Sequence, residues 1–338
     1  MQKEYKLSRE ILPDVYKITL PVPGKRPGPV NVYLFKGRIV TLIDTGTAQT
    51  AGLLQKALAE HDLGFADIGR IIVTHGHPEH CGAAKKIVNA GRAKVAAHAE
   101  DVVSIEKGMD VSTGRYRSFL KLTGVPPSTG MMLRLLFFLF KYMADNCGVD
   151  LVMREGDEME IGKYRAKIIG TPGHTKGSVC IYLEKEKALF CGDTLIEHIT
   201  PNAFVMLDEK EPLPVRLSQD EFYGSLEKIK ILCPSMIYSA HGKDIPNIEQ
   251  IIEGYKKAFA ERQEKVLSII LAGEKNVYRI ARLLFPEIGG WRLPLEIFLS
   301  ISEAYTNIQV LHKERKVFLN VINGLLEVTH AQEKGSVQ

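Results

Sequence analysis

The sequence predicts a layered α/β domain followed by a smaller domain of three helices and a β-hairpin. Three observations support this fold class. Apolar strands alternate with helices in the first hundred residues, which is typical of layered α/β folds. Four loops that carry histidine or aspartate each follow an apolar run. These loops stop near residue 250, where helical patterns take over.

The composition is that of an ordinary globular protein. The chain has 338 residues, of which 45% are hydrophobic and 25% charged, and its length favours two domains. A formal net charge of +4 gives only weak support for a polyanionic partner.

The cysteines indicate a reducing compartment. There are five of them, widely scattered and without a CxxC pair, so a disulfide framework is not expected. The first residues lack the apolar segment of a signal peptide. We therefore expect a cytoplasmic protein.

The N-terminal stretch predicts an antiparallel meander. β-rich runs occupy residues 15–20, 30–35 and 39–43, with a turn at 36–38. The third run ends in Asp44, which is followed by Thr-Gly. Such a carboxylate either bonds inward to a metal-binding histidine and fixes its tautomer, or caps the next helix.

Helices and strands then alternate. The spacing of apolar residues predicts a helix over 49–60, a strand at 71–73, a helix ending at Ala90 and a strand at 94–97.

The loop after the strand at 71–73 is a candidate metal site. Within six residues it offers His75, His77, Glu79 and His80. Imidazole nitrogen and carboxylate oxygen suit zinc, iron or manganese. A single histidine after a strand is mostly a surface or capping residue, but this density favours metal binding.

Residues 100 to 150 break the pattern. A hinge-like loop at 125–130 precedes an apolar run at 131–143, which is too short for a membrane span and contains Arg134 and Lys141. As a helix, this run should be buried on more than one side. We consider three roles for it: a lid over the active site, a dimer interface, or interfacial membrane contact.

Three further loops repeat the design of a strand followed by histidine or aspartate near glycine. Strands are expected at 157–161, 164–169, 179–183 and 188–190. His174 follows the second of them, Asp193 follows the fourth, and His241 follows an apolar run at 236–238.

Together the loops offer seven candidate ligands. These are His75, His77, Glu79, His80, His174, Asp193 and His241. Seven are too many for one tetrahedral ion but fit two ions that share a bridging carboxylate.

The order and spacing of these motifs resemble the metallo-β-lactamase superfamily over roughly residues 10 to 250. The motifs are Asp44-Thr45-Gly46, His75-x-His77-x-Glu79-His80, Gly173-His174, Gly192-Asp193 and Ala240-His241-Gly242. The resemblance implies a four-layer αββα sandwich with two metal ions at one edge. It implies that metal 1 is held by His75, His77 and His174. It implies that metal 2 is held by Glu79, His80 and His241, with Asp193 as the bridge.

Glu79 departs from the family, which usually has aspartate at this position. Its carboxylate is one methylene longer, so it reaches metal 2 only if the loop shifts, or else it weakens that site or changes its metal preference. In many relatives this carboxylate also holds or relays a proton. We therefore expect Glu79 and Asp193 to be catalytic, and two divalent ions to bind, with zinc preferred over iron or manganese.

The expected chemistry is hydrolysis. A metal-bound water loses its proton near neutral pH and attacks the substrate. We expect a small-molecule ester, thioester or lactone as substrate. An endoribonuclease or phosphodiesterase is one alternative, and a mononuclear iron sulfur-oxygenase using His75, His174 and Asp193 is another. His198 and Asn202 are candidates for orienting the substrate, against an ordinary role in the loop.

The C-terminal residues predict a winged-helix-like domain. Helices are expected at 254–271, 277–285 and about 295–312, followed by a hairpin over 317–328 with its turn at Asn323-Gly324. The layout resembles the C-terminal domain of a metallo-β-lactamase subgroup that includes an endoribonuclease.

Nucleic-acid binding is nevertheless not expected. Between residues 293 and 311 the third helix contains Glu296 and Glu303 but no lysine or arginine. We expect this domain to cover the metal edge or to mediate a homodimer. The predicted domains are residues 1–250, with a helical lid insertion at about 100–150, and residues 251–338.

Overall fold

The structure is a computed structural model that describes residues 7–23, 27–108, 114–140, 142–205, 213–287 and 294–331. The chain forms two compact units. The first unit contains residues 1–110, 140–201 and 225–251. The second contains residues 111–139, 202–224 and 252–338. The domain limits expected from the sequence stay a prediction.

The first unit contains a mixed sheet of seven strands in sequential order. The strands are β1 (Ser8–Leu12), β2 (Val15–Leu20), β3 (Val30–Phe35), β4 (Val40–Ile43), β5 (Ile68–Ile72), β6 (Lys94–His98) and β7 (Leu151–Met153). Neighbours are antiparallel from β1 to β4 and parallel from β4 to β7. The predicted antiparallel meander is therefore confirmed.

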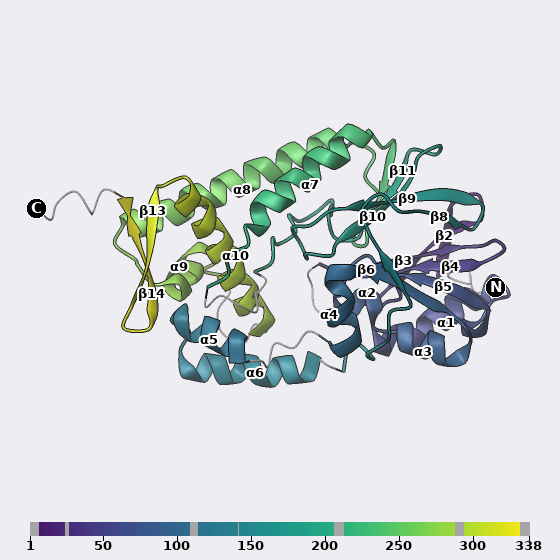
Figure 1. Cartoon of the computed structure of the whole chain (residues 1–338), viewed down its shortest axis with the longest axis horizontal. Helices are drawn as coiled ribbons and strands as arrows, with labels where there is room; N and C mark the ends of the chain where they lie inside the picture. The colour runs from purple at the N-terminus through teal and green to yellow at the C-terminus, as the bar shows by residue number, and fades with distance from the viewer. Residues whose placement is uncertain are drawn as a thin grey trace, which may run out of the picture. The chain divides into compact units, whose positions relative to one another are not determined.

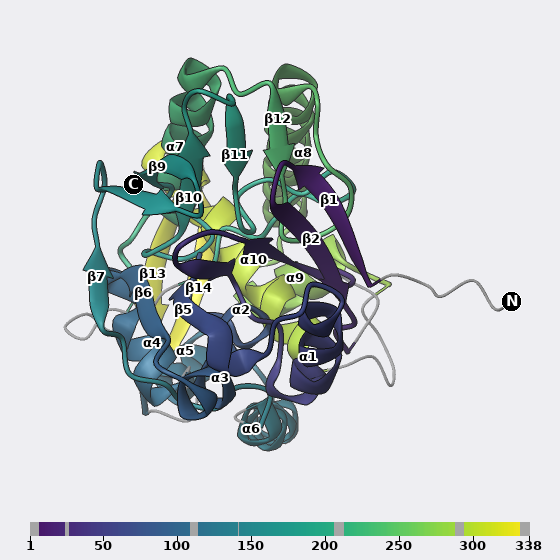
Figure 2. The same ribbon diagram turned by 90° about the vertical axis from the view of Figure 1, so that its right-hand side faces the viewer.

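Short helices cover one face of this sheet, as Figure 2 shows for α1 and α3. They are α1 (Ala51–Ala59), α2 (Pro78–Cys81) and α3 (Ala84–Ala90), and α4 (Val102–Lys107) follows β6. Leu54 and Leu58 of α1 and Ile87 of α3 share one core cluster with Val32 and Leu34 of β3. The helical pattern predicted over 49–60 thus buries its apolar face against the sheet.

A second mixed sheet of five strands has the order β12-β11-β10-β9-β8. Its strands are β8 (Glu158–Ile161), β9 (Tyr164–Gly170), β10 (Val179–Leu183), β11 (Ala188–Phe190) and β12 (Met236–Tyr238). Only β11 and β12 run parallel to each other. The four strands predicted between residues 157 and 190 are confirmed.

The two sheets pack face to face (Figure 1). All six residues of β3 are buried because its alternate side chains enter different cores. Tyr33 and Phe35 point toward the second sheet, where their rings lie 4.9 and 5.1 Å from the ring of Phe190. The predicted α/β class with two packed sheets is confirmed.

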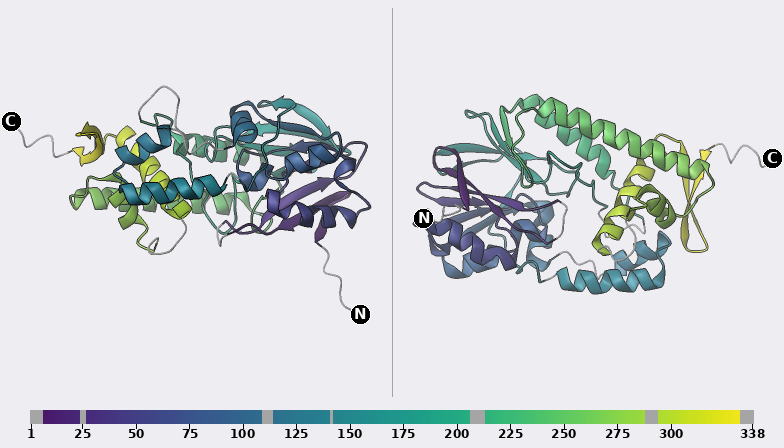
Figure 3. Two further views of the ribbon diagram at one scale, coloured as in Figure 1. Left: turned by 90° about the horizontal axis from the view of Figure 1, so that it is seen from below. Right: turned by 180° about the vertical axis from the view of Figure 1, so that it is seen from behind.

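The second unit is mostly helical (Figure 3). It contains α5 (Gly114–Leu122), most of α6 (Pro127–Phe140), α9 (Val277–Leu284), α10 (Pro294–Lys313) and the hairpin of β13 (Val317–Ile322) and β14 (Leu325–His330). Helices α7 (Ser218–Leu232) and α8 (Ile248–Leu271) contribute residues to both units. The helices and hairpin predicted beyond residue 250 are confirmed as elements, whereas α5 and α7 were not predicted.

Helix α10 is buried along most of its length, polar residues included. Ser302 accepts a hydrogen bond from the amide of Val205 at 2.9 Å, and Gln309 donates to the carbonyl of Pro214 at 2.6 Å. Glu303 is also buried and pairs with Arg262 at 3.0 Å. The polar side chains of this helix therefore hold other segments of the same unit.

The apolar run expected at 131–143 forms helix α6, which begins at Pro127 and ends at Phe140. Leu133 is fully buried, but Met131 is 70% and Leu135 is 63% exposed. The expected burial on more than one side is therefore wrong for the side chains that the structure describes, and Lys141 lies outside them. Among the described helices, none is long and apolar enough to cross a membrane.

Candidate metal centre

The candidate ligands follow the carboxyl ends of strands. In the first sheet, β4 precedes Asp44 and β5 precedes the loop that begins at Thr74, and the two strands are parallel. In the second sheet, β9, β11 and β12 run in one direction and precede His174, Asp193 and His241. Strands that run in one direction end at one edge of a sheet. The loops that follow these strands therefore lie at a single edge of each sheet.

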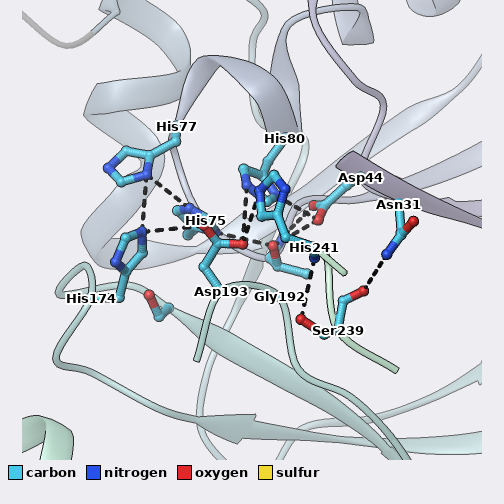
Figure 4. Close-up of polar contacts among 12 residues, drawn as sticks. Asn31, Asp44, His75, His77, His80, His174, Gly192, Asp193, Ser239 and His241 are labelled. Atoms are coloured by element: carbon cyan, nitrogen blue, oxygen red, sulfur yellow. Dashed lines mark hydrogen bonds and ion pairs between the residues drawn. The ribbon is translucent and has the colours of Figure 1, made fainter. Parts of the chain in front are cut away.

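Three histidines form the first ligand group. His75 Nε2 lies 3.0 Å from His77 Nδ1, which lies 3.1 Å from His174 Nε2. Nitrogens bound about 2.0–2.1 Å from one tetrahedral zinc ion would lie about 3.4 Å apart, which is close to this spacing. The three nitrogens are therefore arranged to hold one ion (Figure 4).

Glu79, His80 and His241 form the second ligand group, with one ligand atom of each within 4.8 Å of the others. The Nε2 atoms of both histidines are buried and have no hydrogen-bond partner within the described part of the chain. Leaving such atoms buried without a partner is costly. A cation between them would remove that cost, so the donor set fits a metal ion.

Asp193 lies between the two groups. Its Oδ1 is 3.5 Å from His80 Nε2 and 3.4 Å from His241 Nε2, whereas its Oδ2 is 3.7 Å from His174 Nε2. One carboxylate oxygen thus faces each group, which is the arrangement of a bridging ligand.

Hydrogen bonds fix the tautomers of the second group. His80 Nδ1 donates to Asp44 Oδ2 at 2.8 Å, and His241 Nδ1 donates to the carbonyl of Pro29 at 2.9 Å. In its neutral form, each ring therefore presents an unprotonated Nε2 to the centre. Asp44 also accepts from the amide and hydroxyl of Thr74 and has a φ of 61°, which is strained for a residue other than glycine.

For most of these side chains, the electrostatic surroundings favour the protonation state that binds a metal ion. Burial, together with the neighbouring imidazoles, lowers the pKa of His75 and His77 well below the ordinary value. Burial opposes ionisation of Asp193, but the charges of His241 and His80 hold its pKa well below the usual range. Burial also lowers the pKa of His80, but Asp193 and Asp44 outweigh that effect and raise it.

The His241 loop is held by residues that the sequence did not single out. Asn31 of β3 donates to the carbonyl of Ser239 at 2.9 Å, a contact drawn in Figure 4. Lys17 of β2 donates to the carbonyl of Gly242 at 3.1 Å. The sequence does contain a sign of the role of Asn31, because it is the one polar side chain in an otherwise apolar or aromatic strand.

The two predicted substrate residues have different surroundings. His198 is exposed, donates from Nε2 to the carbonyl of Pro27 at 2.9 Å, and lies against Gly242, where an added Cβ would stand 2.6 Å from its Nδ1. It therefore lies beside the loop of His241. Asn202 instead belongs to the second unit and donates to the carbonyl of Leu299 on α10 at 3.0 Å.

Comparison with known proteins gives matches over most of the chain. A family model described as the metallo-beta-lactamase superfamily matches residues 26–241. A protein of Bacillus subtilis named probable metallo-hydrolase YqjP is 27% identical over 311 residues, which cover 90% of this chain and 94% of that protein.

A hydroxyacylglutathione hydrolase of Methylococcus capsulatus is 29% identical over 133 residues, 38% of this chain. The match spans about half of that enzyme, 48%. A crystal structure of a metallo-beta-lactamase family protein from Thermus thermophilus is similar with a TM-score of 0.81 and 24% identity, covering 95% of this chain and all of that one. This last likeness is one of fold.

Proposed function

The chain belongs to the metallo-beta-lactamase superfamily, and from this premise we propose that it is a hydrolase of small thioesters that works with two divalent metal ions. The observation that carries the proposal is the position of Asp193, with one carboxylate oxygen facing each of two ligand groups. The relative from Bacillus subtilis that matches over 311 residues is named a probable metallo-hydrolase.

We propose zinc as the preferred ion, and the donor set is compatible with it. The groups consist of imidazoles and carboxylates without a thiolate among the described residues. Such donors suit zinc, and also iron and manganese. The second ion depends on Glu79, the half-exposed member of its group.

Bound divalent ions supply Lewis-acid activation of water and of the substrate carbonyl. The residues of the chain supply orientation and proton transfer. Asp44 and the carbonyl of Pro29 hold the imidazoles of His80 and His241 in the tautomer that binds a cation. We propose that Glu79, half-exposed beside them, carries a proton toward the leaving group and that exposed His198 contacts the substrate.

Thioesters are proposed as the first substrate class for two reasons. The chain is similar over about half their length to hydroxyacylglutathione hydrolases, whose substrates carry an acyl group on sulfur. Thiols have a pKa of about 8.5, so a thiolate needs less help from a general acid than an alkoxide does. One half-exposed carboxylate, that of Glu79, would suffice to assist the departure of a thiolate.

The C-terminal residues are proposed to have a structural role in a winged-helix-like arrangement. The support is the hairpin of β13 and β14, joined by a bridge between Glu327 and Asn276 just before α9. Nucleic acid remains an unexpected partner, because the polar side chains of α10 are largely buried. A homodimer through the exposed apolar residues of α6 and a cytoplasmic location, supported by five free cysteines, remain proposals.

Reconstitution tests the function. Metal-free protein is loaded with zinc, iron or manganese, its metal content is measured, and it is offered thioesters, lactones, phosphodiesters and RNA. We expect about two ions per chain and thioester hydrolysis that His77→Ala lowers by about a hundredfold or more, whereas Asp150→Asn, which alters an exposed carboxylate away from the ligands, has little effect.

Less than one ion per chain would count against a metal hydrolase. RNA cleavage lost in His77→Ala would favour the nuclease. Oxygen uptake with a persulfide by the iron-loaded protein would favour the oxygenase.

A further inference from the structure

Asp101 is a buried carboxylate that no motif identified. It ends the short helical turn Ala99–Asp101, directly before α4, and is 1% exposed. An aspartate at the N-cap of a helix ordinarily accepts hydrogen bonds from that helix's own first amides. Asp101 makes no such capping bond.

The carboxylate oxygens of Asp101 instead accept hydrogen bonds from two loops that carry ligands of the first group. Oδ2 accepts from the amide of Gly76 at 2.8 Å, and Gly76 stands between His75 and His77. The same oxygen accepts from the hydroxyl of Thr175 at 2.8 Å, and Oδ1 accepts from the amide of Gly177 at 3.0 Å. One carboxylate therefore joins the loop of His75 and His77 to the loop of His174.

The packing around Asp101 is built for this contact. A Cβ on Gly177 would stand 2.6 Å from both Cγ and Oδ1 of Asp101, so only glycine allows this approach. A Cβ on Gly76 would stand 2.8 Å from the side chain of Ser104 on α4. Both loops thus rest closely on the segment from Asp101 to Ser104.

We propose that Asp101 is a positioning residue that holds His75, His77 and His174 in the geometry that binds the first metal ion. The inference rests on the proposed function only in assuming that the groups bind metal. It gives the first group a supporting aspartate besides Asp44, which bonds directly to His80 of the second group and reaches His75 through Thr74. Outer contacts of this kind typically alter metal affinity by about 10–100-fold when removed.

Single-site proteins separate the two groups. His241→Ala removes a ligand of the second group, and His77→Ala removes a ligand of the first. Zinc affinity is measured by competition with a chelator in each background, with and without Asp101→Asn. The amide keeps the volume of the carboxyl group but puts a donor where an acceptor is needed.

We expect Asp101→Asn to weaken zinc binding about 10–100-fold in the His241→Ala protein and less than about threefold in the His77→Ala protein. Asp44→Asn, which removes the direct bond to His80, should in contrast weaken zinc binding in the His77→Ala protein. Asp150→Asn, whose carboxylate accepts from the amide of Val95 rather than from a ligand loop, should change neither affinity. The d–d spectrum of cobalt in the His241→Ala protein should also change with Asp101→Asn.

An unchanged first-group affinity in Asp101→Asn would overturn the inference, as would equal losses in both backgrounds. Thr175→Val keeps Asp101 and removes one of its three bonds, so it provides a smaller loss of the same kind if Asp101→Asn does not fold. Absence of zinc binding in the parent and in both single-site proteins would instead refute the proposed function. The two failures are therefore distinguishable.

Discussion

We expect Glu79 to govern metal binding by the second ligand group. Its carboxylate lies within 4.8 Å of the ligand nitrogens of His80 and His241, and its side chain is one methylene longer than the aspartate that the family resemblance leads us to expect. Shortening the side chain by a methylene would withdraw the carboxylate from nitrogens whose positions are fixed by Asp44 and Pro29.

We therefore expect Glu79→Asp to weaken binding of the second zinc ion by about tenfold, with the first ion unaffected. Zinc titration followed by metal analysis measures both steps. Glu79→Gln, which keeps the length but removes the charge, is the matched control and should lose the second ion more severely. Equal affinities in Glu79→Asp and the parent would show that the extra methylene is incidental.

His198 and Asn202 give a second comparison of single residues. His198→Ala should raise KM for a thioester by about tenfold without changing metal content, because its ring is exposed beside the His241 loop. Asn202→Ala should leave KM unchanged and lower the free energy of unfolding by about 1 kcal/mol, because its amide is bonded to α10. A raised KM in Asn202→Ala, together with a loss of stability in His198→Ala, would exchange the roles of the two residues.

The sequence predicted which side chains come together at the site better than it predicted what holds them there. His75, His77 and His80 are close together in the chain, and glycine and strand ends mark the other ligand loops. Asp101 and Asn31 bond to backbone groups of residues that lie far away in the sequence. Because nearly every residue has the same backbone groups, the residue types give no sign of these contacts. Such partners become visible only when the loops are placed in space.

Among the elements, α6 presents the clearest contrast. Leu133 is fully buried whereas Leu135, two positions later, is 63% exposed. We expect Leu133→Ala to lower the free energy of unfolding by about 2–5 kcal/mol. Leu135→Ala should change it by less than about 0.5 kcal/mol.

Urea denaturation of both variants beside the parent tests this contrast. Similar losses in the two variants would mean that Leu135 is covered by a partner in solution, as expected of a dimer interface. Dilution of the protein would then reduce the loss in Leu135→Ala but not that in Leu133→Ala.

Element prediction failed where the pattern was weak. Helix α7 has Phe222, Leu226 and Ile229 at helical spacing, but Gly224 interrupts the run and charged residues surround it. The apolar run of α6 was correctly taken for a helix, yet its exposure could not be predicted, because composition gives the polarity of a helix and not what lies against it.

At the scale of the whole chain, the second unit is assembled from three separate stretches. Aromatic pairs join them: Phe119 lies 5.4 Å from Tyr305, Phe204 lies 5.5 Å from Phe298, and Phe222 lies 5.8 Å from Phe259. One member of each pair precedes residue 250 and the other follows it. Each such ring buries about 150–250 Å² in a core.

A protein cut at residue 250 should therefore not fold to a well-packed state, although all seven candidate ligands remain in it. We expect strong binding of an apolar dye and aggregation, measured beside a chain ending at residue 331 as control. A soluble, cooperatively unfolding fragment of residues 1–250 would show that the limit predicted from composition is a true domain boundary.

The same aromatic pairs determine when the core of the second unit can be completed during biosynthesis. Tyr305 follows Phe119 by nearly two hundred positions, so at roughly 5–20 residues per second it leaves the ribosome roughly 10–40 s later. During that interval Phe119 of α5 lacks its aromatic partner beyond residue 250. We therefore expect the nascent chain, rather than the folded protein, to expose apolar surface that a chaperone would bind.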